Sequence, residues 1–319
     1  MPEISIVIPA HNEATNIDII YSEISKELSK ERIEVIFVDD GSTDKSVGQI
    51  LELKSKHSNV RLVRLSRNFG HQAALMAGIA SASGKAIITM DCDMQHSPTH
   101  LPKMVAKWRE GHKIVQMVRQ KTEGIGFFKN LFSNVFYSMI NRLSEFPIVS
   151  GAADFQLLDQ HVAKYLISTK GRQHFIRGTI SWLGFNPATI EYTAMERHSG
   201  SASYSFWHSL KLAKVALFSM SKFPLRLGIY FGVFVALLCF LYIIYTIVMW
   251  FGGETIPGWA SIMVMFLFVG AVQIIILGII GEYIGQIYDS GRSLPAYVKY
   301  PEEDEHFWLE QKTDEPTDP

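Results

Sequence analysis

Two long, uncharged apolar runs near the C-terminal end constrain the fold of this chain more than any other feature. Residues 227–251 and 259–281 contain no Asp, Glu, Lys or Arg. An α-helix needs about 20 apolar residues to cross the hydrocarbon core of a bilayer, and each run exceeds that length. We therefore predict two transmembrane helices, 227–251 and 259–281, in preference to a helical hairpin buried in a large soluble core.

The composition indicates that part of the chain avoids water. Charged residues make up 19% of the sequence, whereas soluble domains have about 25%. The net charge of −1 argues against a nucleic-acid-binding protein, because such proteins are usually clearly basic. The two cysteines, Cys92 and Cys239, lie far apart and predict neither a disulfide framework nor a cysteine-based zinc site.

The small net charge conceals an acidic C-terminal end and a basic remainder. Residues 301–319 hold eight acidic residues and one basic residue, which leaves the first 300 residues with a net charge of +6. Basic residues flank the apolar runs, whereas the turn between the runs carries only Glu254. Because cytoplasmic loops of membrane proteins are enriched in Lys and Arg, we expect both termini, including segment 282–319 with its acidic tail, to be cytoplasmic.

The segment before the first apolar run has the pattern of an amphipathic helix. Between residues 205 and 222, apolar side chains recur at helical spacing and three lysines fall on one side. We predict that region 204–226 is an interfacial helix at the headgroup boundary. The alternative is an ordinary packing helix.

Residues 1–203 have the pattern of an α/β domain. Short apolar runs rich in β-branched residues alternate with helix-like segments, which favours a doubly wound, mainly parallel sheet. The expected strands are 4–8, 34–38, 60–65 and 86–90, and the expected helices are 17–28, 45–56 and 71–82.

Three polar motifs follow these expected strands, at 9–13, 39–44 and 91–95. In such sheets, ligands bind beyond the carboxyl ends of the strands, so the three motifs form a candidate site on one rim. Neither a phosphate-binding P-loop nor a Gly-x-Gly-x-x-Gly motif after a strand is present.

The third motif has the donor atoms of a divalent cation site. Carboxylates at the end of a buried strand are costly unless they are paired or bind a metal. Mg²⁺ or Mn²⁺ prefers oxygen ligands and often bridges carboxylates and phosphates. Asp91, Asp93 and Gln95 therefore predict a metal site that also holds a diphosphate.

Asp40 has two readings. Its carboxylate could accept a hydrogen bond from a base or a ribose hydroxyl, or this motif could cap the helix that follows through Ser42, Thr43 or Asp44. The two roles are compatible. The histidines lack a metal-ligand spacing and are taken as ordinary polar residues.

Together the motifs resemble those of family 2 glycosyltransferases with a GT-A fold. The later motifs are similar to those of the polyprenyl-phosphate, dolichol-phosphate mannose synthase-like group, especially the bacterial two-span, GtrB-like bactoprenol type. The resemblance implies an inverting transfer of a sugar from a nucleotide donor, by default a UDP-sugar, to undecaprenyl phosphate in the bacterial inner membrane, for modification of a cell-envelope glycan. The segments that carry it are 7–13, 38–44, 66–70, 90–96, 182–184, 196–200, 223–226 and 281–288.

The resemblance also implies roles for individual residues. Asp93, Asp154 and Arg197 would be catalytic, with Asp154 orienting the reacting groups and Arg197 close to phosphate. The residues implied in donor binding are Pro9, Glu13, Asp40, Asp91 and Arg119, and those implied in metal binding are Asp91, Asp93 and Gln95.

Two positions depart from the pattern that the chain resembles. Gln156 stands where that pattern has Arg, and Ser203 stands where it commonly has Lys. Loss of two cations at the expected acceptor-phosphate site leaves open an altered acceptor, or a non-catalytic membrane partner of a glycan-modifying complex. The cations that could substitute are Lys170, Arg172, His174 and Arg177.

Two further alternatives concern products and assembly. A processive polysaccharide synthase is disfavoured, because that group usually has more spans and a Gln-x-x-Arg-Trp motif. Small residues in the second apolar run are packing positions through which a homo-oligomer could form. They are Gly270, Gly278, Gly281 and Gly285.

Overall fold

The structure is a computed structural model. It describes residues 2–119, 149, 151–169, 176–192, 223–252, 258–291 and 294–301. These residues fall into two compact units, an α/β unit and a helical unit. Segment 294–301, which follows the helical unit in the sequence, belongs to the α/β unit.

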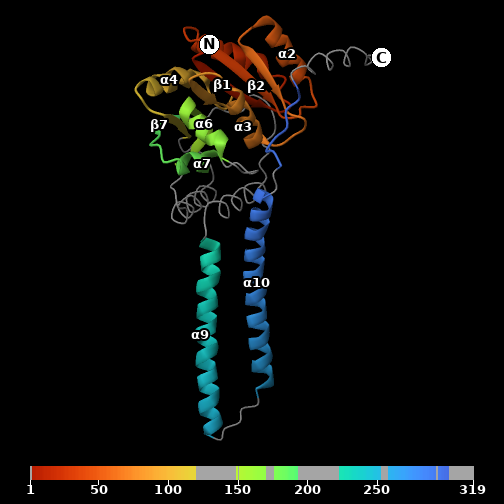
Figure 1. The fold of residues 1–319 in the computed structure, drawn as a ribbon, viewed down its shortest axis with the longest axis vertical. Coiled ribbons are helices and arrows are strands. Elements are labelled where there is room, and N and C mark those ends of the chain that lie inside the picture. The colour runs from red at the N-terminus through yellow and green to blue at the C-terminus, as the bar shows by residue number, and fades with distance from the viewer. Residues whose placement is uncertain are drawn as a thin grey trace, which may run out of the picture. The chain divides into compact units, whose positions relative to one another are not determined.

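Figure 1 shows the sheet of the α/β unit, with β1 and β2 labelled side by side. In the described part of the chain, seven strands form this sheet in the order β3-β2-β1-β4-β6-β5-β7. Strands β1 to β4 are mutually parallel where they pair, β6 is antiparallel to both of its neighbours, and β7 is parallel to β5. The mainly parallel α/β sheet is therefore confirmed, with β6 as the exception. The strands are β1 Ile4–Ala10, β2 Ile33–Asp39, β3 Val60–Arg64, β4 Ala86–Thr89, β5 Ile114–Arg119, β6 Ala152–Asp159 and β7 Ala188–Tyr192.

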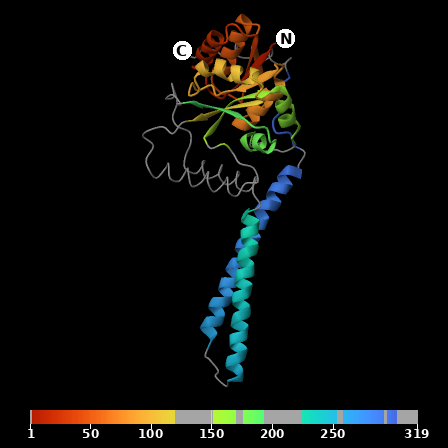
Figure 2. The ribbon, with the colours of Figure 1, turned by 90° about the vertical axis from the view of Figure 1, so that its left-hand side faces the viewer.

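Helices cover both faces of this sheet (Figure 2). The three helices expected between residues 17 and 82 begin and end within one residue of their expected bounds. The helices of the α/β unit are α1 Ile17–Glu27, α2 Ser46–Lys56, α3 His71–Ser81, α4 Leu101–Arg109, α6 Gln160–Ser168 and α7 Ile176–Trp182, with a short 3-10 helix at Pro98–His100.

Alternate residues of each central strand enter different hydrophobic cores. In β2, Val35 and Phe37 belong to the core that includes residues of α1, α2 and α4, whereas Ile36 and Val38 belong to the core that includes residues of α3, α6 and α7. Because both faces are covered, the strand reads as a continuous apolar run rather than an alternating one.

Segment 294–301 covers the edge of the sheet at β3. Ser66 N donates to Val298 O and Tyr300 N donates to Arg64 O, both at 2.9 Å. The Arg64 guanidinium lies 4.9 Å from the centre of the Tyr300 ring. The unpaired backbone groups of an exposed edge strand can pair with another chain and cause aggregation. Segment 294–301 forms hydrogen bonds with some of these groups on β3.

The helical unit consists of α9, Phe223–Phe251, and α10, Trp259–Gly291, which run side by side (Figures 1 and 2). Both are long and apolar enough to cross a membrane, with mean hydropathies of 2.6 over Gly228–Met249 and 1.9 over Phe268–Gly285. Only 7% and 6% of these windows is buried, unlike a core helix of a soluble protein. Both helices extend beyond the runs expected from the sequence.

The interfacial helix and the self-association expected for this unit stay predictions. Of region 204–226, the part from 204 to 222 lies outside the described residues. A Cβ built at Gly270, Gly278, Gly281 or Gly285 would have nothing within 4 Å, so within the described chain these positions are open. Self-association through them stays a prediction.

Helix α3 packs against the sheet at a glycine, which gives a test of this close contact. A Cβ on Gly78 would overlap Val7 Cγ1 and lie 2.8 Å from Val38 Cγ2, whereas a Cβ on Gly48 in α2 would meet nothing within 4 Å. We expect Gly78→Ala to destabilise the protein by about 1–3 kcal/mol through overpacking. Gly48→Ala should instead stabilise it by about 0.5–1 kcal/mol through helix propensity.

Thermal unfolding of the full chain in detergent, followed by circular dichroism, measures both effects. An unfolding temperature of Gly78→Ala equal to or above that of Gly48→Ala would contradict this packing.

Candidate active site

The loops after β1 and β2 are joined into one structure at the carboxyl edge of the sheet. Asn12 Oδ1 accepts hydrogen bonds from Thr43 N at 2.8 Å and from Asp44 N at 3.3 Å, and Asn12 N donates to Ser42 Oγ at 3.0 Å. Asn12 has a φ of 58°, a left-handed conformation that Asn tolerates better than most residues. The first two predicted motifs are therefore brought together.

Asp40 is buried and fixes the chain just before α3. Its Oδ1 accepts from Phe69 N at 2.7 Å and its Oδ2 accepts from Gly70 N at 2.9 Å. At the start of α2, Asp44 Oδ1 accepts from Ser46 N at 2.9 Å, as the capping reading of this motif expects. Asp40 has a further structural role in holding the chain before α3, and its contact with a nucleotide stays a prediction.

Pro9 and Glu13 occupy the same edge. Pro9 lies in β1, where it pairs with Val38 of β2. Glu13 follows in the loop, and its Oε2 accepts from Asn16 Nδ2 at 2.6 Å.

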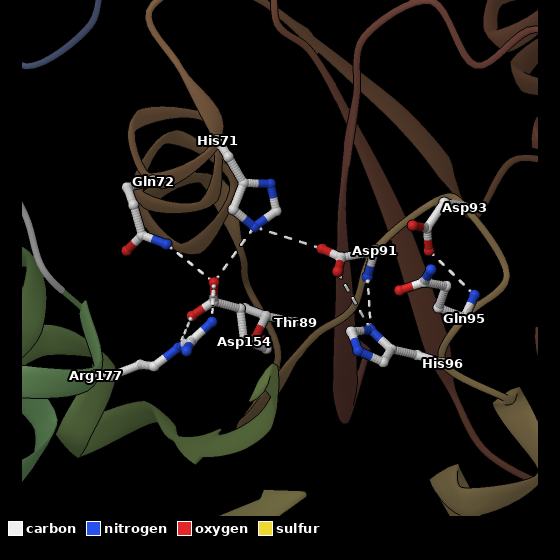
Figure 3. A network of polar contacts seen from close by, with 9 residues as sticks. All are labelled: His71, Gln72, Thr89, Asp91, Asp93, Gln95, His96, Asp154 and Arg177. Carbon is white, nitrogen blue, oxygen red and sulfur yellow. Dashed lines mark hydrogen bonds and ion pairs between the residues drawn. The ribbon is translucent and has the colours of Figure 1, made fainter. Parts of the chain in front are cut away.

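Asp91 lies between two histidines (Figure 3). Its Oδ1 is 3.4 Å from His71 Nε2, and its Oδ2 is 3.5 Å from His96 Nδ1. His96 is buried, and its ring stacks on Phe155 with 5.0 Å between centroids and meets Tyr192 edge-on at 5.7 Å. Packed aromatic rings thus fix the histidine that contacts Asp91, while burial raises the pKa of Tyr192 to about 12.

Asp93 and Gln95 lie on the tight turn that follows Asp91 (Figure 3). Asp93 Oδ1 accepts from Gln95 N at 3.1 Å. Met94 between them has a φ of 62°, which is uncommon for a residue that is not Gly. Asp93 and Gln95 thus follow Asp91 directly in the sequence, and both side chains are half-buried.

Asp154, in β6, is the most heavily paired carboxylate of the site (Figure 3). Arg177 donates from Nε to Oδ1 at 2.8 Å and from Nη2 to Oδ2 at 3.0 Å. Gln72 Nε2 also donates to Oδ2 at 3.0 Å, and His71 Nε2 lies 3.6 Å from it. His71 therefore lies between Asp154 and Asp91 and links the two carboxylates.

These contacts set the charge of Asp154 and His71. Burial alone would raise the pKa of Asp154, but hydrogen bonds from His71 and Arg177 and the positive charge of Arg177 outweigh it and hold that pKa well below its usual range. Burial alone would lower the pKa of His71, but the nearby Asp154 and Asp91 carboxylates raise it. Asp154 is therefore an anion at neutral pH and a poor proton acceptor.

An irregularity in the sheet places Asp154 at this position. The register of β5 and β6 pairs Gln116 with Gln156 and Val118 with Ala152. An advance of two residues along β5 therefore corresponds to an advance of four residues along β6, which is a bulge in β6. Such bulges re-aim side chains next to functional sites. Thr89 Oγ1 donates to Asp154 O at 2.5 Å and fastens the bulged segment to β4.

The structure thus joins Asp91 and Asp154 in one network, with Asp93 and Gln95 on the adjoining turn. Arg119 lies at the exposed end of β5, where its backbone N donates to Gly151 O at 3.0 Å. Arg197 and Ser203 lie outside the described residues.

Sequence reasoning missed His71, Gln72 and His96 as members of this network. Sequence reasoning treated the histidines as ordinary polar residues and did not place any of them beside the carboxylates, whereas His71 and His96 both contact Asp91. A signal was available for the first two, since His71 and Gln72 directly follow the 66–70 motif at the carboxyl edge. Arg177 was one of four candidate cations, and it pairs with Asp154; the other three, Lys170, Arg172 and His174, lie outside the described residues.

The residues present fit a divalent cation shared with a phosphate ligand. Among the described residues, no group of three or more His, Cys, Asp and Glu could hold a metal ion on its own. Asp91 Oδ1 lies 3.4 Å from His71 Nε2 but makes no hydrogen bond among the described residues, so this oxygen keeps the capacity to accept a ligand. Asp91, Asp93 and Gln95 suit Mg²⁺ or Mn²⁺ if phosphate oxygens and water complete the coordination.

The chain is a glycosyltransferase. Residues 5–166 match the family described as "Glycosyl transferase family 2" and residues 223–287 match the "GtrB C-terminal hairpin". The chain belongs to glycosyltransferase family 2 and carries this hairpin at α9 and α10, which confirms the family expected from the motifs.

Relatives cover nearly the whole chain. It is 34% identical over 302 residues to "Bactoprenol glucosyl transferase" of Shigella phage SfV, covering 93% of this chain and 97% of that protein. It is 36% identical over 297 residues to "Uncharacterized glycosyltransferase YkcC" of Bacillus subtilis strain 168, covering 92% of each. A solved structure of glucosyl-3-phosphoglycerate synthase from Mycobacterium tuberculosis, in complex with Mn²⁺, UDP-glucose and phosphoglyceric acid, is 20% identical with a TM-score of 0.49, over 68% of this chain and 79% of that one.

The Asp154–Arg177 pair predicts a large energetic coupling. Asp154→Asn, Arg177→Gln and the double variant should give a coupling free energy of about 1–3 kcal/mol, because the carboxylate is buried and bound at two atoms. Urea unfolding of the full chain in detergent measures it. The exposed pair Lys107–Glu110, at 2.7 Å, is the control and should show no measurable coupling. Equal coupling in both pairs would contradict the assigned geometry.

Proposed function

We propose that this protein is a membrane-bound inverting glycosyltransferase that moves a sugar from a nucleotide donor, by default a UDP-sugar, to polyprenyl phosphate. The observation that carries the proposal is the Asp91–His71–Asp154 network at the carboxyl edge of a family 2 domain. The two helices of membrane-spanning length and the names of the relatives support a lipid acceptor.

The chemistry of the acceptor suits this site. A phosphate monoester has its second pKa near ~6, so at neutral pH it is largely a dianion. One of its oxygens can attack the anomeric carbon directly while the bond from that carbon to the diphosphate breaks, and nucleoside diphosphate leaves. Because no proton must be removed from the nucleophile, an Asp154 with a low pKa can orient groups without acting as a base.

The protein then has to align two anions and stabilise the leaving diphosphate. Asp91, Asp93 and Gln95 would hold Mg²⁺ or Mn²⁺ with the diphosphate. When bound, the cation neutralises charge that accumulates on the leaving group. Pro9, Glu13 and Asp40 would contact the nucleoside, and Arg119 and Arg197 the phosphates.

We further propose that the α/β unit and both termini face the cytoplasm of a bacterial cell. The basic residues flanking α9 and α10 support this orientation, since the turn between the helices carries only Glu254. A soluble nucleotide donor is then on the same side as the site.

Transfer of label to lipid tests the proposed function. Full-length protein in detergent, mixed with undecaprenyl phosphate and a labelled UDP-sugar, should transfer label into the organic phase. Asp93→Asn should lower the rate by at least about 100-fold, because it removes a carboxylate charge at the diphosphate. Asp18→Asn, at an exposed position on α1, is the matched control and should keep the rate. Absence of labelled lipid with UDP-, GDP- and dTDP-sugars alike would refute the proposal.

Removal of metal gives a second prediction. A chelator should abolish transfer, and Mn²⁺ or Mg²⁺ should restore it. Calorimetry should show that UDP binds the wild-type protein more tightly with Mn²⁺ than without, and that Asp91→Asn loses this difference. A non-catalytic membrane partner would show no transfer at any metal concentration, whereas transfer that persists in excess chelator would exclude the metal role.

A further inference from the structure

A row of polar side chains crosses strands β4, β6 and β5, two residues along β6 from Asp154. Thr89 of β4 pairs with Gln156 of β6, and Gln156 pairs with Gln116 of β5. Residues paired in register point to the same face of a sheet. These three side chains therefore form one continuous row.

The next row into the protein is apolar. Ile87, Leu158 and Ile114 are also paired across the same strands, and all three belong to the core under α3, α6 and α7. The polar row thus separates the active-site edge from a packed hydrophobic core. Leu or Ile would fit the pattern of such a strand equally well.

Three of the four amide atoms of this row have no hydrogen-bond partner among the described residues. Gln156 is fully buried, and in this part of the chain neither its Oε1 nor its Nε2 is bonded. Gln116 is 3% exposed, and its Oε1 is likewise without a partner there. Leaving a buried donor or acceptor without a partner costs about 1–3 kcal/mol, so these atoms indicate a bound polar ligand.

The position of the row identifies what that ligand contacts. Gln156 follows Asp154 by two residues on the same face of β6, and Thr89 is bonded to the Asp154 carbonyl. Arg177 and Gln72, from α7 and α3, hold the Asp154 carboxylate. The amides therefore lie behind the carboxylate, on the side of the sheet core.

We propose that Gln156 and Gln116 bind buried water that hydrogen-bonds to Asp154, and that Gln156 is a positioning residue for this carboxylate. Water is the ligand of a size that a close-packed sheet interior accommodates, and buried waters typically make about three hydrogen bonds to such groups. An amide can both donate to and accept from water.

This inference rests on the proposed function for its kinetic test. Gln156→Met keeps the length of the side chain and removes the amide. We expect kcat for sugar transfer to fall about tenfold, with KM for the UDP-sugar within twofold and the unfolding temperature unchanged or higher. Gln156→Asn, which retains an amide, should recover part of kcat. Gln49→Met, the same change on α2 with a partner at the surface, should leave kcat unchanged.

An unchanged kcat in Gln156→Met would overturn the inference while leaving the proposed function intact. So would a fall in kcat matched by a lower unfolding temperature, because the amide would then have a structural role. The second readout needs no activity: a crystal structure of the full chain at about 2 Å should show water within hydrogen-bond distance of Gln156 and Asp154. Amides bonded only to each other, without such water, would overturn the inference even if wild-type protein transfers no sugar.

Discussion

The parallel register of β1 with β2 and β4 is the constraint on which the site depends. Ala10 pairs with Asp39, and Val7 pairs with Thr89. The ends of these three strands therefore meet at one edge, and the loops that carry Asn12, Asp40 and Asp91 leave the sheet together. A shift of one residue in this register would turn buried side chains to the opposite face and separate the carboxylates from their partners.

The two edges of the same sheet treat buried polar groups differently. At the amino edge, Glu34 accepts from Ser5 Oγ at 2.5 Å, Ser83 N at 2.6 Å and Arg61 Nη1 at 3.2 Å. Burial opposes its ionisation, but these bonds outweigh it and lower its pKa. At the carboxyl edge, Asp91 Oδ1, Gln116 Oε1 and both amide atoms of Gln156 have no hydrogen-bond partner within the described part of the chain. Glu34 is therefore fully engaged in hydrogen bonds within the protein, whereas polar atoms at the carboxyl edge are left to bond to ligands or water.

Local sequence pattern predicts the elements but only part of the site. The apolar runs of β1, β2 and β4, and the helices between them, could be predicted because each has its own periodicity. The antiparallel β6 and its bulge follow from pairing with β4 and β5, which no local pattern encodes. For the same reason Arg177 could be proposed as a cation but not assigned to Asp154, since α7 and β6 meet only in the folded sheet. The positions of Asp91, Asp93 and Gln95 were predictable, because they follow directly from the end of β4.

The proposed substrates differ in solubility, and this difference explains why one chain contains both the α/β unit and the apolar helices α9 and α10. A nucleotide donor stays in water, whereas a polyprenyl chain stays in the bilayer, and their reacting groups meet only at the membrane surface. Large exposed side chains such as Phe231 and Phe266 would be unfavourable in water and favourable in lipid. After α10 the chain pairs with the β3 edge through Val298 and Tyr300, next to the 66–70 loop whose N–H groups hold Asp40. The segment that follows α10 in the sequence is thus part of the α/β unit, and it lies beside the loop that holds one of the carboxylates proposed to contact the nucleotide.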